Sequence, residues 1–166
     1  MSIDQNTSTS DPHNADDLYV TNLSEAQISL KKAYLLLSYG HFNQAINSCT
    51  EATKLCPDNY LAPSLHGAIL VAAGRINEAI QHLSRVMRRF PNEILPRLYF
   101  CEACLLGGRT QRGLKELGTI GKTITEDSPW FPFYENVQAT FEGLDPSQIP
   151  APLVVPDAPD EETLQG

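Results

Sequence analysis

Two stretches of the chain carry apolar residues at the three- and four-residue spacing of an amphipathic helix. They cover residues 42–55 and 76–90, and their apolar positions are Phe42, Ala45, Ile46, Cys49, Ala52 and Leu55, then Ile76, Ala79, Ile80, Leu83, Val86, Met87 and Phe90. The stretches 33–37 and 68–73 are instead apolar all round. Such stretches are typical of helices that are covered on more than one side. The pattern therefore predicts an all-α chain.

The helical pattern repeats every 34 residues. Three sets of residues share this spacing: Gly40, Gly74 and Gly108; Ala45 and Ala79; Pro57 and Pro91. Glycine is expected to end the first helix of each pair at positive φ, and the small alanine lets the second helix pack closely. Proline ends the second helix because it cannot continue it. The chain is thus predicted to be a series of stacked helix pairs.

Two capping patterns set the expected outer limits of the helices. Residues 24–27 read Ser-Glu-Ala-Gln, a capping box that predicts the start of the first helix. Asp127 and Ser128 precede Pro129, which predicts an N-cap and a last helix over residues 129–142.

This pattern resembles the tetratricopeptide repeat (TPR) family, with repeats at 26–59, 60–93 and 94–127. The third repeat is degenerate, because Gly113 stands where the small alanine is expected and no proline closes it. The resemblance implies a TPR-type helical solenoid of about three helix pairs plus a C-terminal capping helix. The expected domain covers residues 21–144, between disordered acidic tails at 1–20 and 145–166.

In TPR proteins the first helix of each pair lines the concave surface, so the resemblance assigns the inner positions. Nine of them are apolar and form the candidate peptide-binding set: Leu30, Tyr34, Leu37, Leu61, Ala68, Val71, Leu95, Leu98 and Leu105. Either a tightly wound superhelix buries this face itself, or the face is a groove for an extended apolar peptide. The set lacks the Lys, Asn and Arg with which cochaperone TPRs hold a carboxylate.

The chain is also similar to the class II translocator chaperones of bacterial type III secretion. The similarity rests on Pro96-Arg97 and on the stretch Cys101-Glu-Ala-Cys-Leu-Leu106. It implies a cytoplasmic chaperone or adaptor that holds an apolar segment of a secreted client. The alternative is a general TPR scaffold subunit of a multiprotein complex. Both functions predict protein partners. A homodimer of this chain is an alternative assembly.

The net charge of −8 belongs to the two ends of the chain. Residues 1–19 and 145–166 hold nine of the 20 acidic residues and no Lys or Arg, which leaves residues 20–144 at +1. This distribution argues against nucleic-acid binding. No apolar run reaches the length of a membrane span, and the first residues do not read as a secretory signal, so a cytoplasmic location is expected.

Residues 145–166 contain five prolines and are expected to be a linker or a solvated end. Within them, residues 151–156 read Ala-Pro-Leu-Val-Val-Pro, which resembles the Pro-x-Leu-x-x-Pro pattern of the chaperones' clients. A second hypothesis is therefore that this segment occupies the concave groove, in its own chain or in a neighbouring copy.

No spacing in the sequence points to catalysis or to a cofactor. Cys101 and Cys104 fall inside a predicted helix and are expected to pack in the core, since zinc needs about four ligands. The four histidines form no arrangement typical of a nucleophile and its base. We expect neither an enzyme nor a cofactor.

Arg85, Arg88 and Arg89 are predicted to form a small basic patch on the outer surface. It is either a solvated face or a docking site for an acidic partner, which includes another copy's tail.

Overall fold

The structure is a computed structural model, and it describes residues 12–143, with side chains from Asp17 onward. Within that range the chain forms seven α-helices and no strand. Their bounds are α1 Pro12–Ser38, α2 Phe42–Leu55, α3 Leu61–Ala72, α4 Ile76–Arg89, α5 Leu95–Leu106, α6 Thr110–Gly121 and α7 Phe131–Glu142. The predicted all-α class is confirmed.

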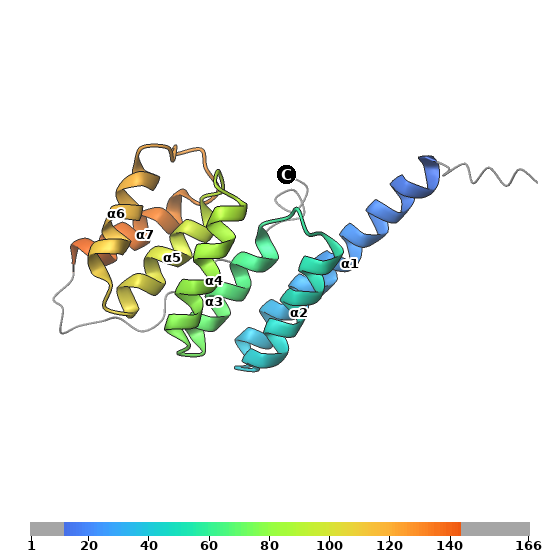
Figure 1. The fold of residues 1–166 in the computed structure, drawn as a ribbon, viewed down its shortest axis with the longest axis horizontal. Coiled ribbons are helices and arrows are strands. Elements are labelled where there is room, and N and C mark those ends of the chain that lie inside the picture. The colour runs from blue at the N-terminus through green and yellow to red at the C-terminus, as the bar shows by residue number, and fades with distance from the viewer. Residues whose placement is uncertain (1–11, 144–166) are drawn as a thin grey trace, which may run out of the picture.

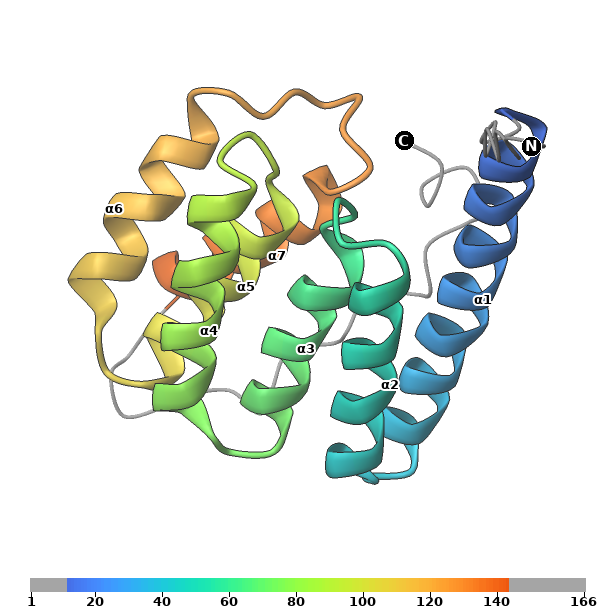
Figure 2. The same ribbon diagram turned by 45° about the vertical axis from the view of Figure 1, so that its right-hand side comes forward.

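The first six helices form three antiparallel pairs that stack side by side, and α7 follows as a single helix (Figures 1 and 2). Each helix packs against the next one up to α6, and α5 also contacts α3 and α7. This is the TPR-type solenoid with a C-terminal capping helix that the 34-residue repeat predicted.

The same hydrogen-bonded turn ends the first helix of every pair. Gly40, Gly74 and Gly108 have φ of 74°, 76° and 70°. The Gly40 N–H donates to the Leu37 carbonyl at 3.0 Å, and the following N–H, of His41, donates to the Leu36 carbonyl at 2.9 Å. The corresponding bonds recur after α3 and α5. This is a Schellman motif, so the predicted role of the repeated glycine is confirmed.

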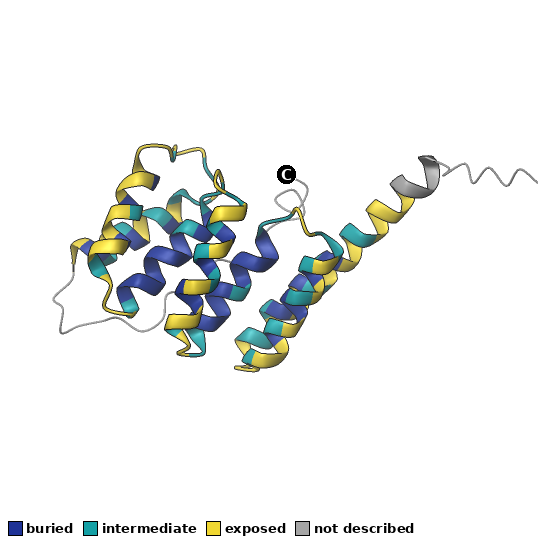
Figure 3. Cartoon of the chain, in the orientation of Figure 1, coloured by how far each residue is buried: buried dark blue, intermediate teal, exposed yellow. Residues whose placement is uncertain are grey.

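Burial follows the predicted periodicity. On the second helices the side chains facing the partner helix are buried, and they include Ala45, Cys49 and Ala52 of α2 and Ala79, Ile80, Leu83 and Val86 of α4. Helices α3 and α5 are buried at most positions, because both lie between neighbouring helices (Figure 3). The core is therefore continuous along the stack.

The predicted start of the first helix is wrong. Ser24 lies in the middle of α1, which begins at Pro12, and the described part of the expected acidic tail, residues 12–20, is helical. The physical reason is that no Gly or Pro interrupts the chain between Pro12 and Gly40. Proline at the first helical position is also favourable, because its missing N–H would have no helical partner there. Residues 1–11 lie outside the described part of the chain.

The last helix begins two residues later than expected. Trp130, rather than Ser128, occupies the N-cap position and makes no side-chain capping bond, and Pro132 lies in the first turn. The Ser128 hydroxyl instead accepts a hydrogen bond from the Trp130 N–H at 3.3 Å. Phe133, Val137 and Phe141 form the buried face of α7, and the Phe133 ring lies 5.2 Å from that of Tyr99 on α5. The helix thus covers the end of the stack.

Candidate protein-binding surfaces

The structure places the nine predicted inner residues largely inside the fold. Tyr34 and Leu37 of α1 are half-buried, and the other seven are buried: Leu30, Leu61, Ala68, Val71, Leu95, Leu98 and Leu105. A partner segment on this face would therefore reach the α1 residues first. The role of this set in peptide binding stays a prediction.

Two tyrosines, the half-buried Tyr34 and the buried Tyr99, interact electrostatically in this inner region. Burial, and then the nearby Cys49 thiol, raise the pKa of the Tyr34 hydroxyl. Burial also raises the pKa of the Tyr99 hydroxyl, with a further contribution from Tyr34. The Tyr99 hydroxyl is buried without a hydrogen-bond partner in the structure of the described residues. An unsatisfied buried hydroxyl destabilises the fold, since it has lost its hydrogen bonds to water.

Exposed apolar side chains gather on α1. Of the large exposed apolar residues in the described range, only Leu114 of α6 lies elsewhere; the rest are Leu18, Tyr19, Val20, Ile28 and Leu35 of α1 and Tyr39 directly after it. Ile28, Leu35 and Tyr39 are 67%, 57% and 71% exposed and lie seven and four residues apart. Ile28 and Leu35 therefore share one helix face, and Tyr39 follows in the turn after the helix, where its N–H donates to the Leu35 carbonyl at 3.3 Å. We call these three residues the α1 outer face.

A shallow groove runs beside this face. It has a volume of about 460 Å³ and is lined by Glu25, Ile28 and Ser29 of α1 and by Glu51, Lys54 and Leu55 of α2. The first turns of α1 project beyond the end of α2 (Figures 1 and 2). Leu18, Tyr19 and Val20 belong to the N-terminal part of α1. The predicted disordered tail over residues 1–20 included these three residues, although their apolar run and the absence of Gly and Pro between Pro12 and Gly40 favour a helix.

A second surface feature is a cleft of about 680 Å³ between α4, α5 and α6. Its lining combines basic and apolar side chains: Ser84, Met87 and Arg88 of α4, Pro91 in the following turn, Arg97 and Phe100 of α5, and Arg112, Lys115 and Glu116 of α6. Four of these residues are basic and one is acidic. We call this the basic cleft.

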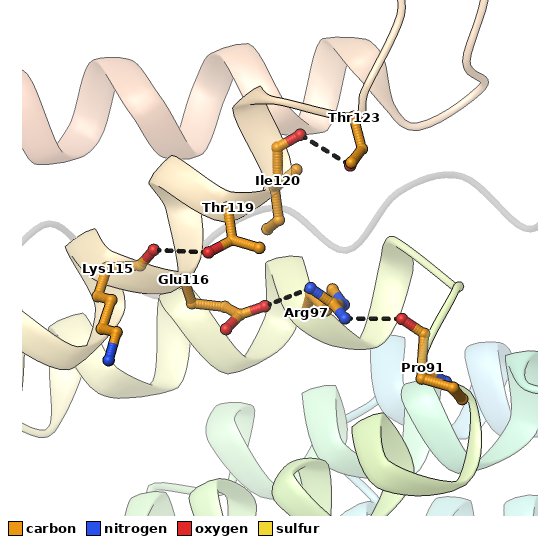
Figure 4. Close-up of polar contacts among 7 residues, drawn as sticks. All are labelled: Pro91, Arg97, Lys115, Glu116, Thr119, Ile120 and Thr123. Carbon is orange, nitrogen blue, oxygen red and sulfur yellow. Dashed lines mark hydrogen bonds and ion pairs between the residues drawn. The ribbon is translucent and has the colours of Figure 1, made fainter.

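One wall of the basic cleft is held by Arg97. Its guanidinium donates to a Glu116 carboxylate oxygen at 2.9 Å and to the Pro91 carbonyl at 2.6 Å, which joins α5 to α6 and to the end of α4 (Figure 4). On the other side the Arg112 guanidinium lies over the Phe100 ring, 4.9 Å from its centre. This distance is that of a cation–π contact.

The three arginines of the basic patch predicted on α4 have different surroundings. Arg88 lines the basic cleft, whereas the Arg89 guanidinium donates to the Pro57 carbonyl at 2.7 Å and Arg85 does not line the cleft. The basic cluster is instead assembled from three helices. Sequence spacing on a single helix could not reveal it.

Three cysteines are buried in the core, and two histidines pack against each other. Cys101 and Cys104 are buried free thiols, as predicted for core residues. Burial raises the pKa of Cys49 to about 12, so this thiol stays protonated. His66 and His82 stack with ring centres 4.1 Å apart, and the His82 Nε2–H donates to the Pro63 carbonyl at 2.8 Å. Among the side chains that the structure describes, from Asp17 to Gly143, no three His, Cys, Asp or Glu residues are grouped to hold a metal ion.

Comparison with known proteins supports the fold assignment. The TPR domain of Arabidopsis OM64 superposes with a TM-score of 0.58 and 16% sequence identity, over 73% of this chain and 97% of that domain. No protein-family model and no curated protein matches the sequence. None of the described helices is long and apolar enough to cross a bilayer. The chain therefore has the architecture of a TPR-like helical repeat protein.

Proposed function

We propose that the chain is a non-enzymatic protein-binding module that contacts a partner through the α1 outer face. The observation that carries this proposal is the gathering of exposed apolar side chains on one helix. Ile28, Leu35 and Tyr39 of this face are each more than half exposed. Exposed apolar side chains grouped on one side of a folded protein are typical of an interaction surface.

The partner segment that fits this surface is an amphipathic helix of another protein. The groove between α1 and α2 offers Ile28 and Leu55 to an apolar stripe, which is the arrangement of a helix bound in a groove. Two of the residues that line the groove, Glu25 and Glu51, are acidic, and one, Lys54, is basic. Their charge favours a partner helix with basic residues beside its apolar stripe.

As a more specific function, we propose a cytoplasmic chaperone or adaptor of type III secretion that binds a client segment on the concave face, in addition to the contact at the α1 outer face. The support is the apolar character of the nine inner positions and the similarity of residues 96–106 to that class of chaperone. A client would meet Tyr34 and Leu37 first, because they are the two inner residues that are only half-buried. A general scaffold subunit is the second candidate. It is favoured because the α1 outer face is exposed and is separate from the inner positions.

The test is affinity purification from the source organism with three forms of the full chain. They are the unchanged chain, the double variant Ile28→Asp/Leu35→Asp, and Leu114→Asp as a control with an acidic substitution at an exposed apolar site elsewhere. We expect one partner to be retained by the unchanged chain and the control and lost from the double variant by about tenfold or more. Equal retention by all three forms would exclude the α1 outer face as the contact.

Two further readouts separate the alternatives. A single dominant client with apolar, membrane-active segments supports the chaperone, whereas several subunits of one stable assembly support the scaffold. Sedimentation of the purified chain addresses the homodimer. If the unchanged chain is a dimer and the double variant a monomer, the α1 outer face binds a second copy and the proposed partner helix is wrong.

A further inference from the structure

We propose that the basic cleft is a second binding site, which takes an acidic segment of a partner protein that carries an apolar side chain among its carboxylates. The site goes beyond the proposed function, because its lining comes from α4, α5 and α6 and shares no residue with the α1 outer face.

The charge of the cleft selects an anionic ligand. Arg97 is already paired with Glu116, but Arg88, Arg112 and Lys115 form no ion pair with any described residue. Three cations thus line one concave surface without a carboxylate of their own. Close positive charges repel one another, and an anion placed between them relieves this repulsion.

The cleft is also shaped in advance for such a ligand. The two hydrogen bonds of Arg97 fix the wall between the Pro91 turn and α6. The contact of Arg112 with the Phe100 ring restrains its guanidinium, so that less side-chain freedom is lost when a carboxylate binds. A preorganised fork of N–H donors suits a carboxylate because it can be bound by two hydrogen bonds at once.

The apolar part of the lining explains why the ligand is a peptide. Met87 and Pro91 contribute hydrophobic surface beside the cations, and the buried Phe100 ring lies beneath Arg112. A volume of about 680 Å³ lies within the range of pockets that hold a drug-sized ligand, so the cleft is larger than one small anion needs. Nucleic acid is disfavoured, because the chain as a whole carries a net charge of −8 and repels a long polyanion. A short acidic segment avoids most of that repulsion.

The experiment measures the fluorescence anisotropy of a labelled synthetic peptide with the sequence of residues 150–162, which joins Leu-Val-Val to four carboxylates. The peptide is titrated with the unchanged full chain. It is also titrated with an amide form of the full chain, in which Asp157, Asp160, Glu161 and Glu162 are replaced by Asn or Gln so that the chain's own segment cannot compete. The charge-reversal variant Arg88→Glu/Arg112→Glu is compared with Arg85→Glu, an equally exposed arginine of α4 that lies outside the cleft.

We expect the double reversal to weaken binding by about tenfold or more, because Arg88 and Arg112 line the cleft. Arg85→Glu should weaken it by about twofold at most, because that charge acts only from outside the cleft. Replacing the peptide's carboxylates by amides should abolish binding, and replacing its Leu-Val-Val by serines should weaken it severalfold. Circular dichroism checks that each variant is folded.

Three results would overturn the proposal. The first is that the unchanged chain and the amide form both fail to bind the peptide. The second is an equal loss for Arg85→Glu and for the double reversal, which would mean diffuse attraction. The third is a single-stranded oligonucleotide of equal charge that binds at least as tightly as the peptide, which would assign the cleft to polyanions in general.

Discussion

Phe141 of α7 lies against Gly113 of α6, in the space that a methyl group would need. A Cβ built on Gly113 would lie 2.8 Å from Cζ of Phe141 and 3.2 Å from Cβ of Cys104. In the two preceding repeats the corresponding residues are Ala45 and Ala79, and both are fully buried. The glycine that makes the third repeat look degenerate is therefore the residue that admits the capping helix.

Gly113→Ala is expected to destabilise the protein even though alanine is the better helix former. The methyl group must displace Phe141, and overpacking of this kind costs about 1–3 kcal/mol. Gly118→Ala is the matched control, because Gly118 lies in the same helix and a Cβ there meets no atom within 4 Å. The control should be more stable by about 1 kcal/mol. Urea unfolding measures both, and a gain in both variants would contradict the packing explanation.

Gly74→Ala should also destabilise the fold, but for a conformational reason. A Cβ at Gly74 has open space, yet its φ of 76° lies in the left-handed region. Alanine there costs about 1–2 kcal/mol, while Gly74→Asn should cost less, because asparagine tolerates this region better. The comparison uses the midpoint of thermal unfolding. If the two variants are equally destabilised, the backbone conformation is not the cause.

The stacked pair His66 and His82 should make stability depend on pH. Burial, and then the neighbouring His82, lower the pKa of His66 to about 4. In the unfolded chain a histidine titrates near pH 6.5, so below that pH the unfolded state binds more protons. The free energy of unfolding should therefore fall as the pH decreases from about 6.5 to about 4.

Urea unfolding at pH 7 and pH 5 tests the role of the histidine pair. His66→Gln should flatten the dependence between these two values, whereas the exposed control His41→Gln should keep it. Equal pH dependence in both variants would assign the effect to other groups.

Tyr99→Phe is expected to leave the fold equally stable or to stabilise it by about 1 kcal/mol, because it removes a buried hydroxyl without a partner. The ring contact with Phe133 is kept by the substitution. Calorimetry of the isolated chain measures the effect. A clear loss of stability would show that the hydroxyl is hydrogen-bonded in solution.

Cysteine modification should report on burial. Of the four free thiols, Cys56 is half-buried and the other three are buried. A thiol reagent should modify Cys56 first, and Cys49, Cys101 and Cys104 only after unfolding, since a buried and protonated thiol is unreactive. Mass spectrometry of timed samples identifies the sites, and Cys56→Ser should remove the fast phase. Rapid modification of all four thiols in the native chain would disprove the assigned burial.

Most of the fold could be predicted from the sequence, because the repeated residues have local roles. The positive φ of Gly40, Gly74 and Gly108 and the burial of Ala45 and Ala79 follow from the 34-residue spacing. The start of α1 could not be located in this way. The residues from Ser24 to Gln27 match a capping box, but a local capping pattern does not start a helix where the chain before it is already helical.

The surfaces were harder to predict than the helices. The basic cleft depends on Arg88, Arg97 and Arg112, which are brought together only when three helices pack. The family register predicts which positions face inward, but the extent of their burial depends on how closely successive helix pairs pack in the superhelix. Both features are properties of tertiary packing and leave no periodic signal in the sequence.

The contact between Gly113 and Phe141 also affects at which end of the stack a further helix pair can be added. A further helix pair inserted after α6 would have to displace Phe141 and expose the buried face of α7. A pair added ahead of α1 would meet the exposed side chains of Ile28 and Leu35 and could cover them. Longer versions of this protein, natural or engineered, should therefore be lengthened at the N-terminal end, where a new repeat gains a hydrophobic neighbour and removes none.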